Sequence, residues 1–159
     1  MQMENYISDE MLDEENNLAE AEEIINKHLT FISAELVYGI PIENVVEIIT
    51  NPTITALPLV PPYVKGIINL RGQIVPIIDM RQIMDKPKNE NISISCVIIL
   101  EIDSISIGVL VDEVLQVINI TGKISDTPSK NLSFISGMTN LSDGTVMYRL
   151  DCDTLISIK

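Results

Sequence analysis

The sequence predicts an all-β fold made of two similar β subdomains, with short helices at the ends of the chain. Apolar residues make up 46% of the 159 residues and aromatic residues only 4%. Ile and Val dominate the apolar set, and β-branched side chains favour pleated strands. The apolar runs have strand length and are separated by short polar turns. Similar runs occur twice along the chain, which indicates an internal duplication.

The duplication is clearest in two segments, Val64 to Met84 and Ile135 to Ile156. Each reads as strand, turn, strand and helix start, and each contains Gly-x-x-Asn-Leu, a turn with Gly, and a later Asp. A second pair of blocks, Tyr38 to Ile49 and Ile107 to Ile118, matches at an offset of 69 residues, against 71 to 72 for the first pair. Short strands and tight turns favour two small barrels of roughly five strands each.

The first half is expected to contain strands at 29–33, 37–42 and 45–49, followed by a hairpin at 64–79. Four prolines between residues 52 and 62 predict an extended connection with at most a short edge strand. Asp79 has the features of a helix N-cap, and Gln82 three residues later completes a predicted capping box. One short helical turn over 81–84 should follow.

The second half is expected to repeat this order after a polar loop at 85–91. Strands are predicted at 96–102, 105–111 and 114–120, then a loop at 121–133, a hairpin at 134–150 and a short helix capped by Asp151. The predicted subdomains therefore cover about 36–90 and about 91–150. The strand at 28–35 and the helix at 151–159 are expected to join the two.

Residues 1–27 are predicted to form an acidic tail outside this domain. Nine of the 23 acidic residues precede Lys27, and Ser8 can cap a short helix there. A solvated helix docked through a thin apolar stripe is preferred to a disordered tail or a partner-binding helix.

Charge and composition exclude several function classes. The net charge of −13 repels phosphate backbones and anionic lipid surfaces, so neither nucleic acid nor membrane is an expected partner. The acidic N-terminus does not resemble a secretory signal, and no apolar run is long enough to span a membrane. Two distant cysteines, Cys96 and Cys152, are expected to be free thiols in a reducing compartment. A cytoplasmic location is predicted.

No catalytic, metal or cofactor site is expected. His28 is the only histidine, and no zinc spacing, phosphate-binding loop or calcium loop occurs. Asp79, Asp112 and Asp151 each end an apolar strand, where capping explains a carboxylate better than hydrolysis does. The sequence therefore predicts a binding module without a small-molecule substrate.

Comparing the two copies separates fold from function. Residues kept in both copies are expected to serve the fold: Gly39 and Gly108, Gly66 and Gly137 at bulges or close backbone approaches, Asn69 and Asn140 in turns, and Asp79 and Asp151 as caps. Arg71 is opposed by Ser142, and Glu47 by Gln116. Polar residues present in one copy only are the better candidates for function.

Several blocks resemble the CheW family of bacterial chemotaxis coupling proteins. They are Tyr38-Gly39-Ile40-Pro41-Ile42, Val45-x-Glu47-Ile48, the run from Val64 to Asp79, Gly108-Val109-Leu110-Val111-Asp112, Ile135-Ser136-Gly137 and Leu150-Asp151. The resemblance covers residues 28–159. It implies two SH3-like five-stranded β-barrels and a non-catalytic scaffold that bridges the regulatory domain of the CheA histidine kinase and the cytoplasmic tip of chemoreceptors. A CheV-like protein, or a coupling module for a kinase outside chemotaxis, is the alternative.

The resemblance also implies individual roles. Glu47, Gly66 and Arg71 match positions associated with receptor or kinase contact. Val45 and Val117 match positions near the receptor groove. Gly108 and Gly137 match positions where change impairs function, which the fold alone can explain.

Overall fold

The computed structural model describes residues 27–87, 95–120 and 134–157. The predicted tail helix and the loop at 121–133 lie outside these ranges, as does most of the loop at 85–91. The strands are β1 (Lys27–Ser33), β2 (Leu36–Pro41), β3 (Val45–Thr50), β4 (Val64–Leu70), β5 (Gln73–Asp79), β6 (Cys96–Ile102), β7 (Ile105–Val111), β8 (Glu113–Asn119), β9 (Ile135–Asn140) and β10 (Val146–Leu150). The helices are η1 (Ile42–Asn44), α2 (Met80–Ile83) and α3 (Cys152–Ile156).

The strands form two five-stranded sheets with the same internal order. Sheet A has the order β8-β1-β2-β10-β9, and sheet B has the order β3-β6-β7-β5-β4. In each sheet one parallel pair, β2 with β10 or β7 with β5, joins two antiparallel groups. The mostly-β fold with two five-stranded sheets and few short helices is confirmed.

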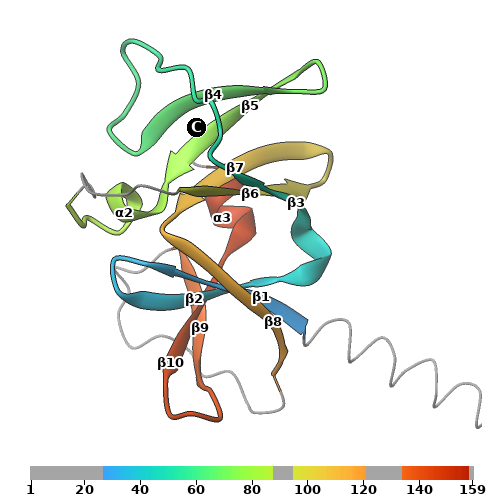
Figure 1. Ribbon diagram of the computed structural model, residues 1–159, viewed down its shortest axis with the longest axis vertical. Coiled ribbons are helices and arrows are strands. Elements are labelled where there is room, and N and C mark those ends of the chain that lie inside the picture. The colour runs from blue at the N-terminus through green and yellow to red at the C-terminus, as the bar shows by residue number, and fades with distance from the viewer. Residues whose placement is uncertain (1–26, 88–94, 121–133, 158–159) are drawn as a thin grey trace, which may run out of the picture.

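The two halves of the chain exchange strands, as Figure 1 shows. Each repeat places its first two strands in one sheet and its next three in the other. The boundary expected near residue 90 therefore does not divide the two sheets. The physical reason lies at η1, which follows Pro41 directly and turns the chain out of sheet A into β3 of sheet B. After β7 the chain returns to sheet A through Asp112 alone, without a helical turn.

The sheets share one hydrophobic core, with α3 between them (Figure 1). Phe31 and Tyr38 of sheet A, Ile98 and Leu100 of sheet B, and Leu155 of α3 are all buried in this core. A smaller cluster packs on the other side of sheet B and consists of Ile68, Val75, Ile77, Val97, Ile99 and Leu110. The shared core explains why two repeats form one packed unit.

Both predicted helix caps are confirmed, but the capping box is wrong. The Asp79 carboxylate accepts the Arg81 amide at 3.0 Å, and the Asp151 carboxylate accepts the Thr154 amide at 3.3 Å. The Asp79 amide donates to the Tyr63 carbonyl at 2.7 Å, so it is not available to a Gln82 side chain. Among the described residues, no helix is long and apolar enough to cross a membrane.

Candidate functional site

The two polar residues singled out by the repeat form an ion pair. Arg71 lies at the tip of the β4–β5 hairpin and Glu47 lies in β3, and Arg71 Nη2 is 3.3 Å from Glu47 Oε2. The Arg71 side chain is 76% exposed and the Glu47 side chain 27%. An ion pair this exposed contributes little to stability. The ion pair does connect the two edges of sheet B, because β3 and β4 are the edge strands in the sheet order.

Arg71 is held in an unusual backbone conformation. Arg71 and Gly72 both have positive φ, +53° and +84°, as a two-residue type I′ hairpin turn requires. The Asn69 side-chain oxygen accepts the Gly72 amide at 3.0 Å, which confirms the turn role predicted for Asn69. A left-handed residue other than Gly, Asn or Asp is disfavoured by about 1–2 kcal/mol. The turn conformation does not favour arginine at this position. A role for the Arg71 side chain in binding would explain why arginine occurs here.

Glu47 lies where β3 is irregular. The pairing between β3 and β6 shifts register between Val45 and Glu47, which is a β-bulge. Glu47 Oε2 accepts from Arg71, whereas Glu47 Oε1 is buried and has no hydrogen-bond partner among the described residues. A buried carboxylate oxygen without a donor is costly. Glu47 Oε1 therefore keeps an unused capacity to accept a hydrogen bond.

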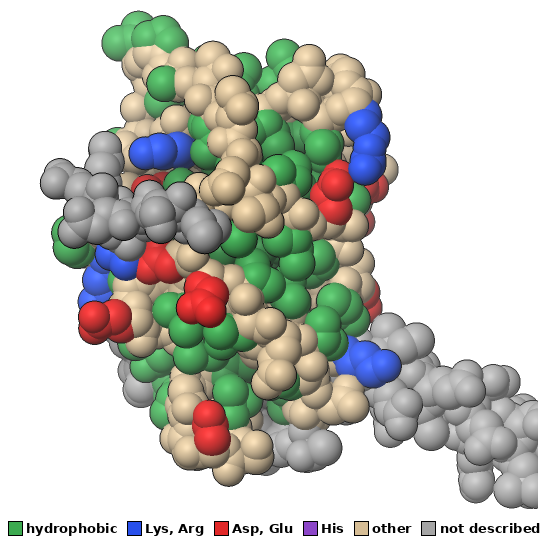
Figure 2. Space-filling view, in the orientation of Figure 1, with side chains coloured by type: hydrophobic (Ala, Val, Ile, Leu, Met, Phe, Trp, Pro, Cys, Tyr) green, Lys and Arg blue, Asp and Glu red, His purple; other side chains and the backbone are tan. Residues whose placement is uncertain are grey.

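Apolar side chains flank this pair on the outer strands of both sheets. Val46 and Ile48 of β3 are 47% and 42% exposed, and the equivalent Leu115 and Val117 of β8 are 42% and 50% exposed. β3 and β8 are each the first strand in their sheet's order. Figure 2 shows hydrophobic side chains gathered across the middle of one face, between the two sheets. Exposed apolar surface of this kind marks interaction sites.

The other predicted site residues are spread over both sheets. Val45 is half-buried against the shared core, and Val117 lies on the opposite sheet. Gly66 sits at a bulge with φ +153°, and a Cβ there would lie 2.2 Å from the Thr55 carbonyl oxygen. A side chain at Gly108 would meet Ile77 and Val97. Gly137 is buried in β9.

The structure thus brings Glu47 and Arg71 together in one contact and places Val45 and Gly66 in the same sheet. Val117 and Gly137 belong to the other sheet, and Gly108 serves internal packing. Sequence reasoning missed Val46, Ile48 and Leu115 as surface residues. The signal was present, because β3 carries apolar residues on both of its faces although it ends a sheet.

A second ion pair, which the sequence did not predict, lies where the chain passes from sheet B to sheet A. Asp112 lies between β7 and β8 and caps no helix. Its carboxylate accepts a bidentate hydrogen bond from Arg81 of α2, with Arg81 Nε 3.0 Å from Oδ1 and Arg81 Nη2 2.5 Å from Oδ2. The Ala34 amide of the β1–β2 turn also donates to Asp112 Oδ2, at 3.0 Å. Both ionised side chains are mostly buried, at 16% and 18% exposure.

These contacts set the pKa of both groups. Burial alone would raise the pKa of Asp112, but the hydrogen bonds from Arg81 and Ala34 and the Arg81 charge outweigh it, so the pKa lies below its usual range. The hydrogen bond to Asp112 likewise raises the pKa of Arg81. The pair stays ionised across the neutral range and fixes α2 against the β1–β2 turn.

The described residues contain no group of three or more His, Cys, Asp or Glu side chains placed to hold a metal ion. Burial raises the pKa of the Cys152 thiol to about 11. His28 is buried in β1.

Comparison with known proteins gives consistent matches. The family profile of the CheW-like domain matches residues 27–159. The chain is 29% identical to "Chemotaxis protein CheW" of Thermotoga maritima over 130 residues, which is 80% of this chain and 85% of that protein. It is 32% identical to "Chemotaxis protein CheV3" of Helicobacter pylori over 77% of this chain, but only 42% of that protein.

The fold has a solved counterpart. The crystal structure of the scaffolding protein TtCheW from Thermoanaerobacter tengcongensis superposes with a TM-score of 0.72 at 32% sequence identity. The match covers 79% of this chain and 88% of that one.

Proposed function

The chain belongs to the CheW-like domain family, and from this premise we propose that it is a non-catalytic adaptor that couples chemoreceptors to the CheA histidine kinase in bacterial chemotaxis. The protein would act in the cytoplasm, at receptor arrays. Its relatives carry the names of chemotaxis proteins, and the similar solved structure is named a scaffolding protein. The same proposal includes SH3-like barrels, with the Arg71–Glu47 contact drawing the ends of sheet B together.

The observation that carries the proposal is the Glu47–Arg71 pair beside the apolar side chains of β3. Glu47 holds one buried, unpartnered oxygen within the part of the chain that the structure describes, and Val46 and Ile48 are exposed next to it. A partner that covers this strand can bury the apolar surface of Val46 and Ile48, and the exposed Arg71 guanidinium offers it a charged contact at the edge of the same sheet. We therefore assign Glu47, Arg71, Val45 and Gly66 to a partner contact.

The duplication suggests why such a protein can bridge two partners. β3 and β8 occupy equivalent places in the two sheets and both expose apolar residues. Only β3 carries the ion-paired glutamate, because β8 has Gln116 at the equivalent position. Two similar but unequal surfaces suit two different partners, the regulatory domain of CheA and the receptor tip, with Val117 in the second surface. Gly108 and Gly137 are assigned to the fold.

Binding assays with the full chain test this proposal. We expect Arg71→Ala and Glu47→Ala to weaken co-sedimentation with receptor signalling fragments or CheA by about tenfold or more, as loss of a central contact does. Glu101→Ala, at an exposed position of β6, is the matched control and should bind normally. If neither partner is lost with either variant, the site assignment fails.

A charge swap shows whether Glu47 and Arg71 contact the partner directly or only orient the β4–β5 hairpin. The double variant Glu47→Arg with Arg71→Glu restores the pair in reverse. If the pair only orients the hairpin, binding returns; if either side chain touches the partner, binding stays weak.

A second candidate function is a CheV-like or other kinase-associated coupling module outside chemotaxis. The match to "Chemotaxis protein CheV3", which covers 42% of that protein, favours the CheV-like form of this candidate. A pull-down that identifies the kinase bound by the full chain separates the two candidates, because a module outside chemotaxis would recover a kinase other than CheA.

A further inference from the structure

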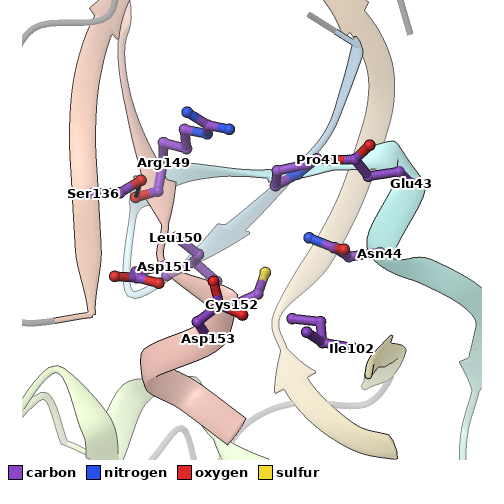
Figure 3. Close-up of a pocket in the computed structure, with 10 residues that line it drawn as sticks. All are labelled: Pro41, Glu43, Asn44, Ile102, Ser136, Arg149, Leu150, Asp151, Cys152 and Asp153. Carbon is purple, nitrogen blue, oxygen red and sulfur yellow. Dashed lines mark hydrogen bonds between the residues drawn. The ribbon is translucent and has the colours of Figure 1, made fainter. Parts of the chain in front are cut away.

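A pocket at the start of α3 is not used by the proposed adaptor site. It has a volume of about 310 Å³ and lies between β2 with η1 on one side and the start of α3 on the other. Figure 3 shows the side chains that surround it, among them Glu43, Asn44, Ile102, Cys152 and Asp153. None of these belongs to β3 or β8.

The duplication identifies what this pocket corresponds to. At the offset of 69 residues Glu43 is the equivalent of Asp112, and at the offset of 72 Asp153 is the equivalent of Arg81. In the other half of the molecule these two positions hold a guanidinium against a carboxylate, with Arg81 filling the space between α2 and the end of β7. Here both positions are acidic, and the space between α3 and the end of β2 is open.

Two carboxylates at this pocket form no ion pair within the part of the chain that the structure describes. Its ion pairs are those of Arg71 with Glu47 and Arg81 with Asp112, so Glu43 and Asp153 have none. Asp151 is engaged in capping α3. Arg149 stands at the upper wall of the pocket in Figure 3, above the two acidic side chains Asp151 and Asp153 of α3 and its cap. The pocket thus has two carboxylates without an ion pair, from two elements, and its three acidic side chains outnumber its one guanidinium.

We propose that this pocket receives the guanidinium group of an arginine side chain from a partner protein. Two independent observations point to this occupant: an open, negatively charged pocket of side-chain size, and the guanidinium held by the equivalent positions in the other half of the same molecule. Arginine fits better than lysine because its planar fork of donors matches carboxylates bidentately. The inference is independent of which partner binds β3.

Small probes test the pocket directly on the full chain. N-acetyl-arginine amide is titrated into the 15N-labelled protein, and N-acetyl-citrulline amide, which is nearly isosteric but uncharged, serves as the control probe. We expect shifts of the amides of residues 43–44 and 151–154 with the arginine probe only. Glu43→Gln and Asp153→Asn should each weaken binding by about tenfold, the effect of removing one charged hydrogen-bond partner. Equal response to both probes, or no effect of either variant, overturns the proposal.

A complementary pair of variants tests the equivalence of the two halves. Asp153→Arg should close the pocket from within by pairing with Glu43, which abolishes probe binding and raises the melting temperature. Arg81→Ala should open the equivalent space in the other half, and added ethylguanidinium should restore its melting temperature more than it changes that of the unmodified chain. Probe binding by Asp153→Arg at unchanged affinity, or no rescue of Arg81→Ala, contradicts the inference.

Discussion

At the scale of single residues, one of the two ion pairs involves residues that the sequence singled out, and the other does not. Arg71 and Glu47 were singled out because their repeat counterparts are Ser142 and Gln116, and the structure places them 3.3 Å apart. The Arg81–Asp112 pair was not foreseen, since a carboxylate at the end of a strand carries no local sign of an arginine that lies 31 residues earlier in the chain. Local sequence signals capping but not long-range ion pairs.

Tyr38 presents a further residue-scale feature. Its ring is 1% exposed and stacks on Phe31 at 5.4 Å between ring centroids. Its hydroxyl has no hydrogen-bond partner within the described ranges. Burial, with a smaller contribution from Tyr148, raises the pKa of Tyr38 to about 12.

We expect Tyr38→Phe to stabilise the protein by about 1 kcal/mol at neutral pH, because it removes an unpaired buried hydroxyl and keeps the ring. The phenol ionises near pH 10 in the unfolded chain but near 12 when folded. The unfolded state therefore loses its proton first, and the unmodified chain loses stability between pH 10 and 12. Tyr38→Phe should lose less over that range in urea unfolding at each pH.

Tyr148→Phe is the control at neutral pH, because it removes the hydroxyl of a half-buried tyrosine. A destabilisation of Tyr38→Phe by more than about 1 kcal/mol would mean that its hydroxyl is satisfied after all.

At the scale of elements, strand positions were predictable and turn conformations were not. The strands at 96–102 and 105–111 match β6 and β7 residue for residue, because their apolar runs end at clear polar turns. The turns at Ala34-Glu35 and Asp103-Ser104 have positive φ at both residues, the type I′ geometry. Ala-Glu is not a signature of that turn, so this turn type could not be predicted from the two residues.

Replacing Ala34-Glu35 by Asn-Gly should stabilise the protein. Ala34 and Glu35 have φ of +50° and +69°, which Asn and Gly adopt more readily. The Ala34 amide that binds Asp112 is kept, since it belongs to the backbone. We expect a gain of about 1–2 kcal/mol in the free energy of unfolding, measured by chemical denaturation.

The same exchange at the equivalent turn, Asp103-Ser104, is the matched control. Asp tolerates the left-handed region better than Ala does, so the gain there should be smaller. Equal gains at both turns would show that backbone strain is not the cause.

At the scale of the whole molecule, the repeat was visible in the sequence but the strand exchange was not. β3 resembles β8, and β6 resembles β1, so the local patterns allow β3 to pair with either β1 or β6. The structure pairs β3 with β6. The turn at η1 and the core that both sheets share favour the pairing of β3 with β6. Neither feature can be recognised from a local sequence pattern.

The strand exchange predicts how the protein behaves when it is cut. Fragments 1–90 and 91–159 each lack two or three strands of both sheets. We expect neither fragment to unfold cooperatively alone, and an equimolar mixture to recover the circular dichroism spectrum and single transition of the intact chain. Cooperative unfolding of either fragment by itself would show that the predicted subdomains fold separately.

The exchange also orders events during protein synthesis. All five strands of sheet B lie between Val45 and Val111, so this sheet is complete in the nascent chain before β9 and β10 are made. Sheet A cannot form completely until β10 has been synthesised, because β2 pairs with β10 through contacts such as Val37 with Met147. At about 5–20 residues per second, the β1–β2 hairpin stays without its central partner for several seconds on the ribosome. Its unpaired edge is then open to other chains, so this hairpin is where a chaperone would be needed during translation.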